Sequence, residues 1–142
     1  MIKFNNKNSE YLFHIHVASL LKKIQLSGVD FLFWHTPNGE SRSKAAGGRL
    51  KLMGVLAGVP DLCLMMNGRL IFIELKRGTG TTSKPQGAFI ASASKHGFKT
   101  FVISEWGALT NVLSDFLQKD ISSISAKVFE SYMGMVGSPK PI

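Results

Sequence analysis

Two acidic residues and a lysine interrupt the most apolar part of the sequence. Asp61, Glu74 and Lys76 lie in "GVPDLCLMMNGRLIFIELKRG", residues 58 to 78, among side chains that are typical of β-strands. Carboxylates are ligands for hard divalent cations, and a lysine ammonium pairs with anionic groups. These three side chains are therefore the first candidates for chemistry, provided that the fold brings them together.

The dipeptide Asn67-Gly68 predicts that this segment is a β-hairpin with strands at 61–66 and 69–76. Asn-Gly is favoured in a type I′ turn, because both central residues of that turn need positive φ. Counting outward from the turn places Asp61 directly opposite Glu74, in a non-hydrogen-bonded pair with Cβ atoms about 5 Å apart. Lys76 is expected on the same face as Glu74, about 7 Å further along the strand.

Two facing carboxylates repel each other, so the pair predicts a compensating cation. A divalent ion that takes oxygen ligands from both carboxylates compensates well, and Mg²⁺ is typically bound by one or two carboxylates, waters and substrate phosphate. The alternative is a solvated salt-bridge cluster at the end of the sheet, in which Asp61 and Glu74 share Lys76. The hairpin pattern alone leaves both interpretations open.

The spacing of apolar residues predicts an α/β chain. The expected elements, in order, are a helix capped by Ser9 and ending near Gly28, a strand over 30–35, a polar loop over 36–48 with a helical turn near Lys51, the hairpin, a helix capped by Ser83 and ending at Gly97, a strand over 99–103 and a helix capped by Ser104. This order predicts a mixed central sheet flanked by helices. The tail from Ile121 onward is left unassigned.

The length of 142 residues predicts one domain over 1–142, with a core over about 9–118 and a C-terminal extension over 119–142. The single cysteine, Cys63, cannot form an internal disulfide, and no apolar run reaches the roughly 18 residues that span a bilayer. We therefore expect a soluble, unexported, cytoplasmic protein with no membrane partner, a description that includes a viral protein acting in the host cytoplasm.

Positive charge is concentrated around the candidate acids. The net charge is +8, and the segment from Ser41 to Ser104 holds ten Lys and Arg residues against two acids, Asp61 and Glu74. Such a field favours a polyanion such as nucleic acid, although a basic solvated surface or an acidic protein partner is also open. The candidate nucleic-acid-binding cations are Arg42, Lys44, Arg49, Lys51, Arg77 and Lys84.

The residues around the hairpin form a wider pattern that resembles the virus-type replication-repair nuclease (VRR-NUC) branch of the PD-(D/E)XK nuclease superfamily. Pro60-Asp61 and Glu74-Leu75-Lys76 match the superfamily signature, and the flanking G-x-x-x-G-x-P-D and S-x-x-Q patterns are supplied by Gly54, Gly58, Ser83 and Gln86. The resemblance covers about residues 9–104. It implies an α/β fold with a restriction-endonuclease-like αβββαβ core.

The resemblance also implies roles for the central residues. Asp61 and Glu74 would be the metal carboxylates, and the backbone carbonyl of Leu75 a further ligand. Lys76 would orient or polarise the attacking water and stabilise charge on the phosphate. The implied cofactor is Mg²⁺ or Mn²⁺.

For several further residues the resemblance implies a functional role, and a structural role is also open. Glu10 matches the acid that the family carries on its first helix, which implies a further catalytic and metal-binding residue. It is in helical register with Phe13. The alternative is an acid in the first turn that interacts with the helix dipole. Gln86 could serve metal-bound water or substrate phosphate, or form a helix-to-loop hydrogen bond. A similar polar segment precedes the PD motif in the family, so substrate contact and a structural loop role are both open for His35, Asn38 and Arg42.

The function that the resemblance implies is metal-dependent hydrolysis of DNA phosphodiester bonds. By family analogy the enzyme would be an endonuclease that acts as a homodimer on branched or structured DNA, in replication, repair or recombination. Two alternatives are a catalytically silent nucleic-acid-binding module of the same fold and a nuclease subunit of a restriction or transposition system.

Overall fold

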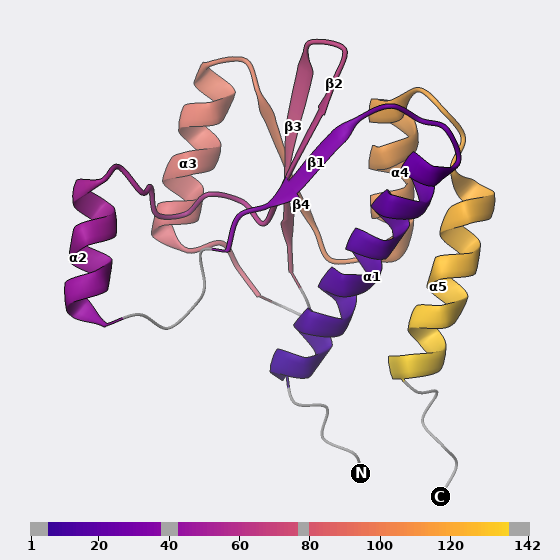
Figure 1. The fold of residues 1–142 in the computed structure, drawn as a ribbon, viewed down its shortest axis with the longest axis horizontal. Helices are drawn as coiled ribbons and strands as arrows, with labels where there is room; N and C mark the ends of the chain where they lie inside the picture. The colour runs from indigo at the N-terminus through magenta and orange to yellow at the C-terminus, as the bar shows by residue number, and fades with distance from the viewer. Residues whose placement is uncertain (1–5, 38–42, 77–79, 137–142) are drawn as a thin grey trace, which may run out of the picture. The chain divides into compact units, whose positions relative to one another are not determined.

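The computed structural model describes residues 6–37, 43–76 and 80–136, which form the mixed α/β chain predicted from the sequence (Figure 1). Its elements, in chain order, are α1 (Asn6–Leu26), β1 (Leu32–His35), α2 (Lys44–Leu52), β2 (Leu62–Met66), β3 (Arg69–Leu75), α3 (Lys84–Lys95), β4 (Lys99–Ile103), α4 (Trp106–Leu117) and α5 (Ser122–Val136). No helix in these ranges is long and apolar enough to span a bilayer.

The strands form one four-stranded sheet in the order β1-β2-β3-β4. β2 and β3 are antiparallel neighbours joined by a tight turn. β3 and β4 are also neighbours, but α3 connects them, which is the kind of crossover that parallel strands require. The result is the mixed sheet that the element order predicted.

The hairpin has the predicted turn and register. Asn67 and Gly68 both have positive φ, 50° and 74°, as a type I′ turn requires. The paired residues run without a bulge from Met66 opposite Arg69 to Leu62 opposite Ile73. Asp61 and Glu74 therefore follow directly after the last pair, on opposite strands.

Residues 44–52, most of which were expected in a loop, form a helix of nine residues. Ser43 begins α2 by accepting a hydrogen bond from the backbone N–H of Ala46 at 3.1 Å. The adjacent Gly47 and Gly48 favoured a loop because glycine is a poor helix former. The N-cap and the basic residues in the last turn favour the helix instead.

Three further boundaries extend or correct the predictions. α1 begins at Asn6, so Ser9 lies within the helix and is not its N-cap. The C-terminal extension, unassigned from Ile121 onward, contains α5, on which Val128 and Tyr132 are buried. Glu105 rather than Ser104 is the N-cap of α4, and its side chain makes no capping hydrogen bond.

The chain divides into two compact units: residues 1–32, 75–80 and 102–142 form the first, and residues 33–74 and 81–101 form the second. In the first unit α5 packs against α1 and α4, around aromatic contacts among Phe13, Trp106 and Tyr132. In the second unit α3 packs on the hairpin, where the rings of Phe72 and Phe89 meet with centroids 5.0 Å apart. The single domain expected over 1–142 stays a prediction.

Candidate functional site

Glu74 is a buried acid, with a residue exposure of 5%. Strand alternation explains its direction: Ile71 and Ile73 point to one face of β3, while Phe72 and Glu74 point to the face that α3 covers. A buried carboxylate is strongly destabilising unless hydrogen-bond donors compensate it. The donors around Glu74 therefore define the site.

Among the described residues, Asp61 and Gln86 donate hydrogen bonds to the Glu74 carboxylate. The backbone N–H of Asp61 donates to Oε2 at 3.2 Å, and the side-chain amide of Gln86 donates to Oε1 at 2.9 Å. The first bond follows from the register, because Asp61 occupies a non-hydrogen-bonded position and its N–H is not used in the β2–β3 ladder. Glu74 thus connects the two sides of the hairpin to α3, and the predicted proximity of Asp61 and Glu74 is confirmed.

Gln86 is itself held at the N-terminus of α3. Its side-chain oxygen accepts from the backbone N–H of Ser83 at 2.8 Å, and its own backbone N–H donates to the Ser83 hydroxyl at 3.3 Å. This reciprocal pair is a capping box. The helix-to-loop bond that the sequence left open is therefore present, and the same amide also holds Glu74.

The loop before Asp61 lies against the same helical turn. Gly58 has φ +82°, and a Cβ atom at that position would lie 2.3 Å from the backbone C and O of Pro85 and 2.6 Å from the backbone N of Gln86. Only glycine combines this φ with so close an approach. Gly58 thereby brings the Pro60-Asp61 segment to the first turn of α3.

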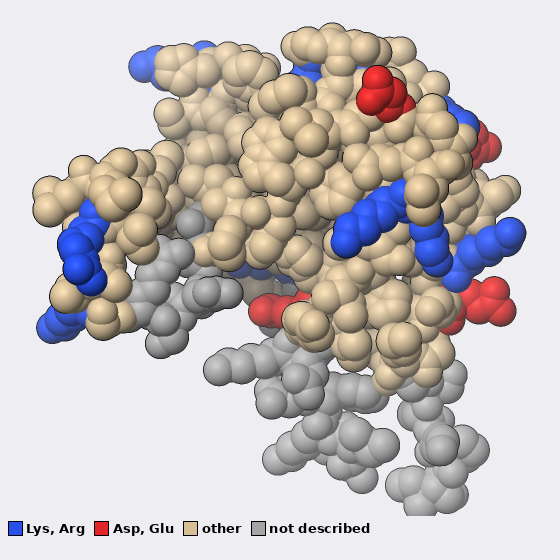
Figure 2. Space-filling view, viewed as in Figure 1, with Lys and Arg blue, Asp and Glu red and all other residues tan. Residues whose placement is uncertain are grey.

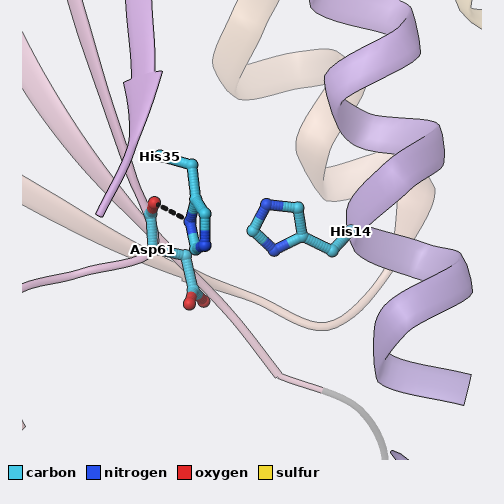
Figure 3. Close-up of side chains that lie close together, drawn as sticks. All are labelled: His14, His35 and Asp61. Carbon is cyan, nitrogen blue, oxygen red and sulfur yellow. Dashed lines mark hydrogen bonds between the residues drawn. The ribbon is translucent and has the colours of Figure 1, made fainter. Parts of the chain in front are cut away.

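The backbone of Asp61 is fixed from the other side by the end of β1. The Asp61 carbonyl accepts from the backbone N–H of Thr36 at 2.9 Å and from Nδ1 of His35 at 2.7 Å (Figure 3). Because a carbonyl only accepts, the proton lies on Nδ1 of His35, and Nε2 carries the lone pair in the neutral ring. His14, also drawn in Figure 3, belongs to α1 in the first unit.

The contact between His35 and Asp61 was missed at the sequence level. The structural role left open for His35 is present, and its role in DNA contact stays a prediction. A polar residue at the very end of a short apolar strand was the available signal, but the sequence did not show that β1 would be the neighbour of β2.

Three predicted site residues lie in the first unit. Leu75 ends β3, and the backbone N–H of the following Lys76 donates to the Ile103 carbonyl in β4 at 2.9 Å. Glu10 is exposed while Phe13 is buried, so the expectation that Glu10 follows the inward stripe of α1 is wrong. An ionised carboxylate is more stable in water than in an apolar interface. Its assignment as a metal ligand stays a prediction.

The candidate DNA-binding cations that the structure describes are exposed. Lys44, Arg49 and Lys51 lie along α2, where Figure 2 shows Lys and Arg side chains at the left of the view, and Lys84 begins α3. Arg42, Arg77 and Asn38 lie outside the described residues.

The charge of the second unit is strongly asymmetric. Its described acids are Asp61 and Glu74, and its described cations are Lys44, Arg49, Lys51, Arg69, Lys84, Lys95 and Lys99. A surface with this excess of positive charge attracts polyanions. The two neighbouring carboxylates can bind a cation within it.

Cys63 lies on the same face of the hairpin, opposite Phe72, and is 3% exposed. Burial raises the pKa of its thiol to about 11. The thiol is therefore protonated at neutral pH, which excludes it as a nucleophile for this site.

No protein-family description matches the sequence, and no curated protein matches it. A solved structure described as "VRR_NUC domain protein" is similar in fold: the TM-score is 0.50, the identity is 24%, and the match covers 61% of this chain and 67% of that chain. At this identity the similarity shows the fold alone. The chain therefore has a restriction-endonuclease-like α/β fold.

Proposed function

We propose that this chain is a divalent-metal-dependent nuclease of the VRR-NUC family that hydrolyses DNA phosphodiester bonds. The observation that carries the proposal is the buried carboxylate of Glu74, hydrogen-bonded to the backbone of a second acid, Asp61, within a cationic unit. The fold similarity to a VRR_NUC domain protein supports it.

The available donors suit a hard cation. The Asp61 and Glu74 carboxylates and the Leu75 carbonyl offer oxygen ligands, which Mg²⁺ and Mn²⁺ prefer, and Glu10 is a further predicted ligand. When bound, such an ion lowers the pKa of water and neutralises charge on a phosphate.

The protein's own groups have separate tasks in this proposal. Gln86 and the Asp61 N–H hold the Glu74 carboxylate in one orientation, and His35 fixes the Asp61 backbone. Lys76, two residues after Glu74 in the chain, orients the attacking water and pairs with the phosphate charge. The exposed cations of α2 and Lys84 bind flanking phosphates.

The finer details rest on the family resemblance. We propose that the substrate is branched or structured DNA, encountered in replication, repair or recombination, and that two copies of the chain act as a homodimer. Sedimentation analysis at several protein concentrations tests the second statement.

The direct experiment incubates the purified protein with linear, flapped and four-way-junction DNA in Mg²⁺, Mn²⁺ or EDTA, beside Asp61→Asn. We expect cleavage in Mg²⁺ or Mn²⁺, faster on the structured substrates, and none in EDTA or with the variant. Cleavage in EDTA, or full activity of Asp61→Asn, would contradict the mechanism. Salt-sensitive binding without cleavage would instead support a catalytically silent module.

A further inference from the structure

A largely apolar pocket of about 490 Å³ opens within the second unit. Its walls are formed by the end of α2 with the loop after it, by α3 with the loop that follows, and by the face of β3 that α3 covers. Its lining includes Lys51, Phe72, Pro85, Phe89, Ala93 and Phe98. This volume lies in the range of pockets that bind small organic groups.

The pocket and the acid pair are built on the same surfaces. Phe72 in the pocket and Glu74 in the site lie two residues apart on one face of β3, about 7 Å along the strand. On α3, Gln86 contacts Glu74 and Phe89 contacts Phe72, one helical turn apart. A ligand in the pocket would therefore lie beside a group bound at Asp61 and Glu74.

The same loop also connects them. Residues 55–57 line the pocket, and Gly58 then packs on Pro85 immediately before Pro60-Asp61. Pro85 lines the pocket as well. One short segment thus forms a wall of the pocket and positions the candidate metal ligand.

Aromatic rings give the pocket its chemistry. The rings of Phe72 and Phe89 meet edge to face, with an interplanar angle of 88°, and Phe98 is 40% exposed at the pocket wall. Small side chains on α3, such as Ala93, leave space beside these rings. Flat aromatic groups bind well in such a place because they stack on or against the rings.

Charge identifies which flat group fits. Lys51 lines the pocket, and the two helices that contribute to its walls, α2 and α3, also carry the exposed cations Lys44, Arg49 and Lys84. A ligand that combines an aromatic ring with attached anions complements this surface. A second copy of the chain, with its own net charge of +8, does not supply those anions.

We propose that the pocket binds an unstacked nucleobase of the DNA substrate, from a nucleotide beside the phosphate that would contact a metal ion bound at Asp61 and Glu74. This inference rests on the proposed nuclease function and adds a structural requirement to it. DNA with an unpaired nucleotide presents such a base without the energy needed to unstack a paired one. The pocket therefore selects for branch points, flaps and bulges over continuous duplex.

The test measures binding in EDTA, with 2-aminopurine as the unpaired nucleotide of a bulged duplex. Stacking on the phenylalanine rings should change its fluorescence. Phe98→Ala removes a ring, and Ala93→Leu fills the pocket. Their matched controls are Met65→Ala, which is also 40% exposed but does not line the pocket, and Ala91→Leu, an exposed residue of α3 outside the pocket.

We expect each pocket variant to bind the bulged DNA about fivefold to a hundredfold more weakly and to lose the fluorescence change. Both controls should behave like the wild type, and binding of a fully paired duplex should not change. Equal binding of bulged DNA by Phe98→Ala, Ala93→Leu and the controls would overturn the inference. The inference would also be overturned if the pocket variants lost equal affinity for bulged and paired DNA, or if their only defect were a loss of self-association.

Cleavage measured on the same substrates separates this inference from the proposed function. If cutting depends on metal and the pocket variants bind and cut bulged DNA like the wild type, the nuclease function is supported and the base pocket is excluded. Pocket-dependent binding without cutting by the wild type would retain the base pocket and remove the nuclease.

Discussion

Each unit of this chain contains a buried polar network, and the two networks differ in composition. In the helical unit, the Trp106 indole N–H donates to the Ser125 hydroxyl at 2.8 Å, and Thr110 contacts Ser125 at 2.6 Å and donates to the Trp106 carbonyl at 3.1 Å. In the hairpin unit, Glu74 accepts from Asp61 and Gln86. The first network is neutral, and the second is built around an acid.

The difference separates a structural network from a functional candidate. The neutral network closes on itself, because every hydroxyl and N–H in it donates to another member. Such a network stabilises the packing of α4 on α5. A buried carboxylate beside a second acid carries a desolvation penalty that the fold does not require, and a bound cation would compensate it. We therefore expect damage to the first network to affect stability and damage to the second to affect activity.

The largest effect is expected from Glu74→Gln. The amide keeps the shape of the side chain but removes the charge that binds a cation, and it leaves one acceptor oxygen for two donors, the Asp61 N–H and the Gln86 amide. Cleavage in Mg²⁺ should fall about a thousandfold, equivalent to about 4 kcal/mol, while the free energy of unfolding should fall by only about 1 to 3 kcal/mol, the cost of one buried donor that loses its acceptor. Kinetics and chemical denaturation measure the two quantities. If the variant is strongly destabilised but its folded fraction cleaves DNA as fast as the wild type, the Glu74 network is structural and not functional.

A second prediction tests the approach of the Asp61 loop to α3. Gly58→Ala adds a Cβ that overlaps the Pro85 carbonyl, in a backbone conformation unfavourable for alanine, and should destabilise the fold by about 3 kcal/mol. Gly54→Ala is the matched control, because Gly54 also has positive φ, +97°, but nothing lies within 4 Å of its Cβ position. The control should lose only about 1 kcal/mol. Equal losses would show that the close approach is unimportant.

The neutral network supplies the third prediction. Ser125→Ala removes the acceptor of the Trp106 indole and should lower the free energy of unfolding by about 2 kcal/mol, with cleavage per folded molecule unchanged. Ser123→Ala, an exposed position on the same helix, should have no measurable effect. A selective loss of cleavage in Ser125→Ala would remove the distinction between the two networks.

The smallest effect concerns Cys63 and alkaline pH. The pKa of the buried thiol is raised from 9.0 to about 11, so the folded chain keeps a proton that the unfolded chain loses. The stabilising contribution is fully present below pH 9 and is lost as the pH rises to about 11. From pH 8 to pH 10 the wild type should lose about 1 kcal/mol more unfolding free energy than Cys63→Ala. Parallel pH profiles would contradict the burial of the thiol.

Local patterns in the sequence predicted the hairpin and its acid pair well. Asn67-Gly68 specifies a turn whose backbone few other dipeptides adopt, and the register then follows from counting residues. α3 was similarly well defined, because Ser83 and Gln86 cap it within four residues of sequence.

The parts that sequence reasoning missed depend on contacts between distant segments. Glu10 shares helical register with buried residues, but its exposure depends on what packs against the N-terminal half of α1. The bond from His35 to Asp61 requires β1 to lie beside β2, and strand order is not encoded in either segment alone. The dual role of Gln86 likewise required the position of Glu74.

The most direct test of the central claim is the thermal unfolding of the wild type, Glu74→Gln and Ser125→Ala with increasing Mn²⁺. An ion that binds only the folded chain raises its unfolding temperature, and the rise grows with the logarithm of the ion concentration once that concentration exceeds the dissociation constant. We predict that Mn²⁺ raises the unfolding temperature of the wild type and of Ser125→Ala by the same amount, and that Glu74→Gln does not respond. An equal rise in all three proteins would contradict a metal site at Asp61 and Glu74.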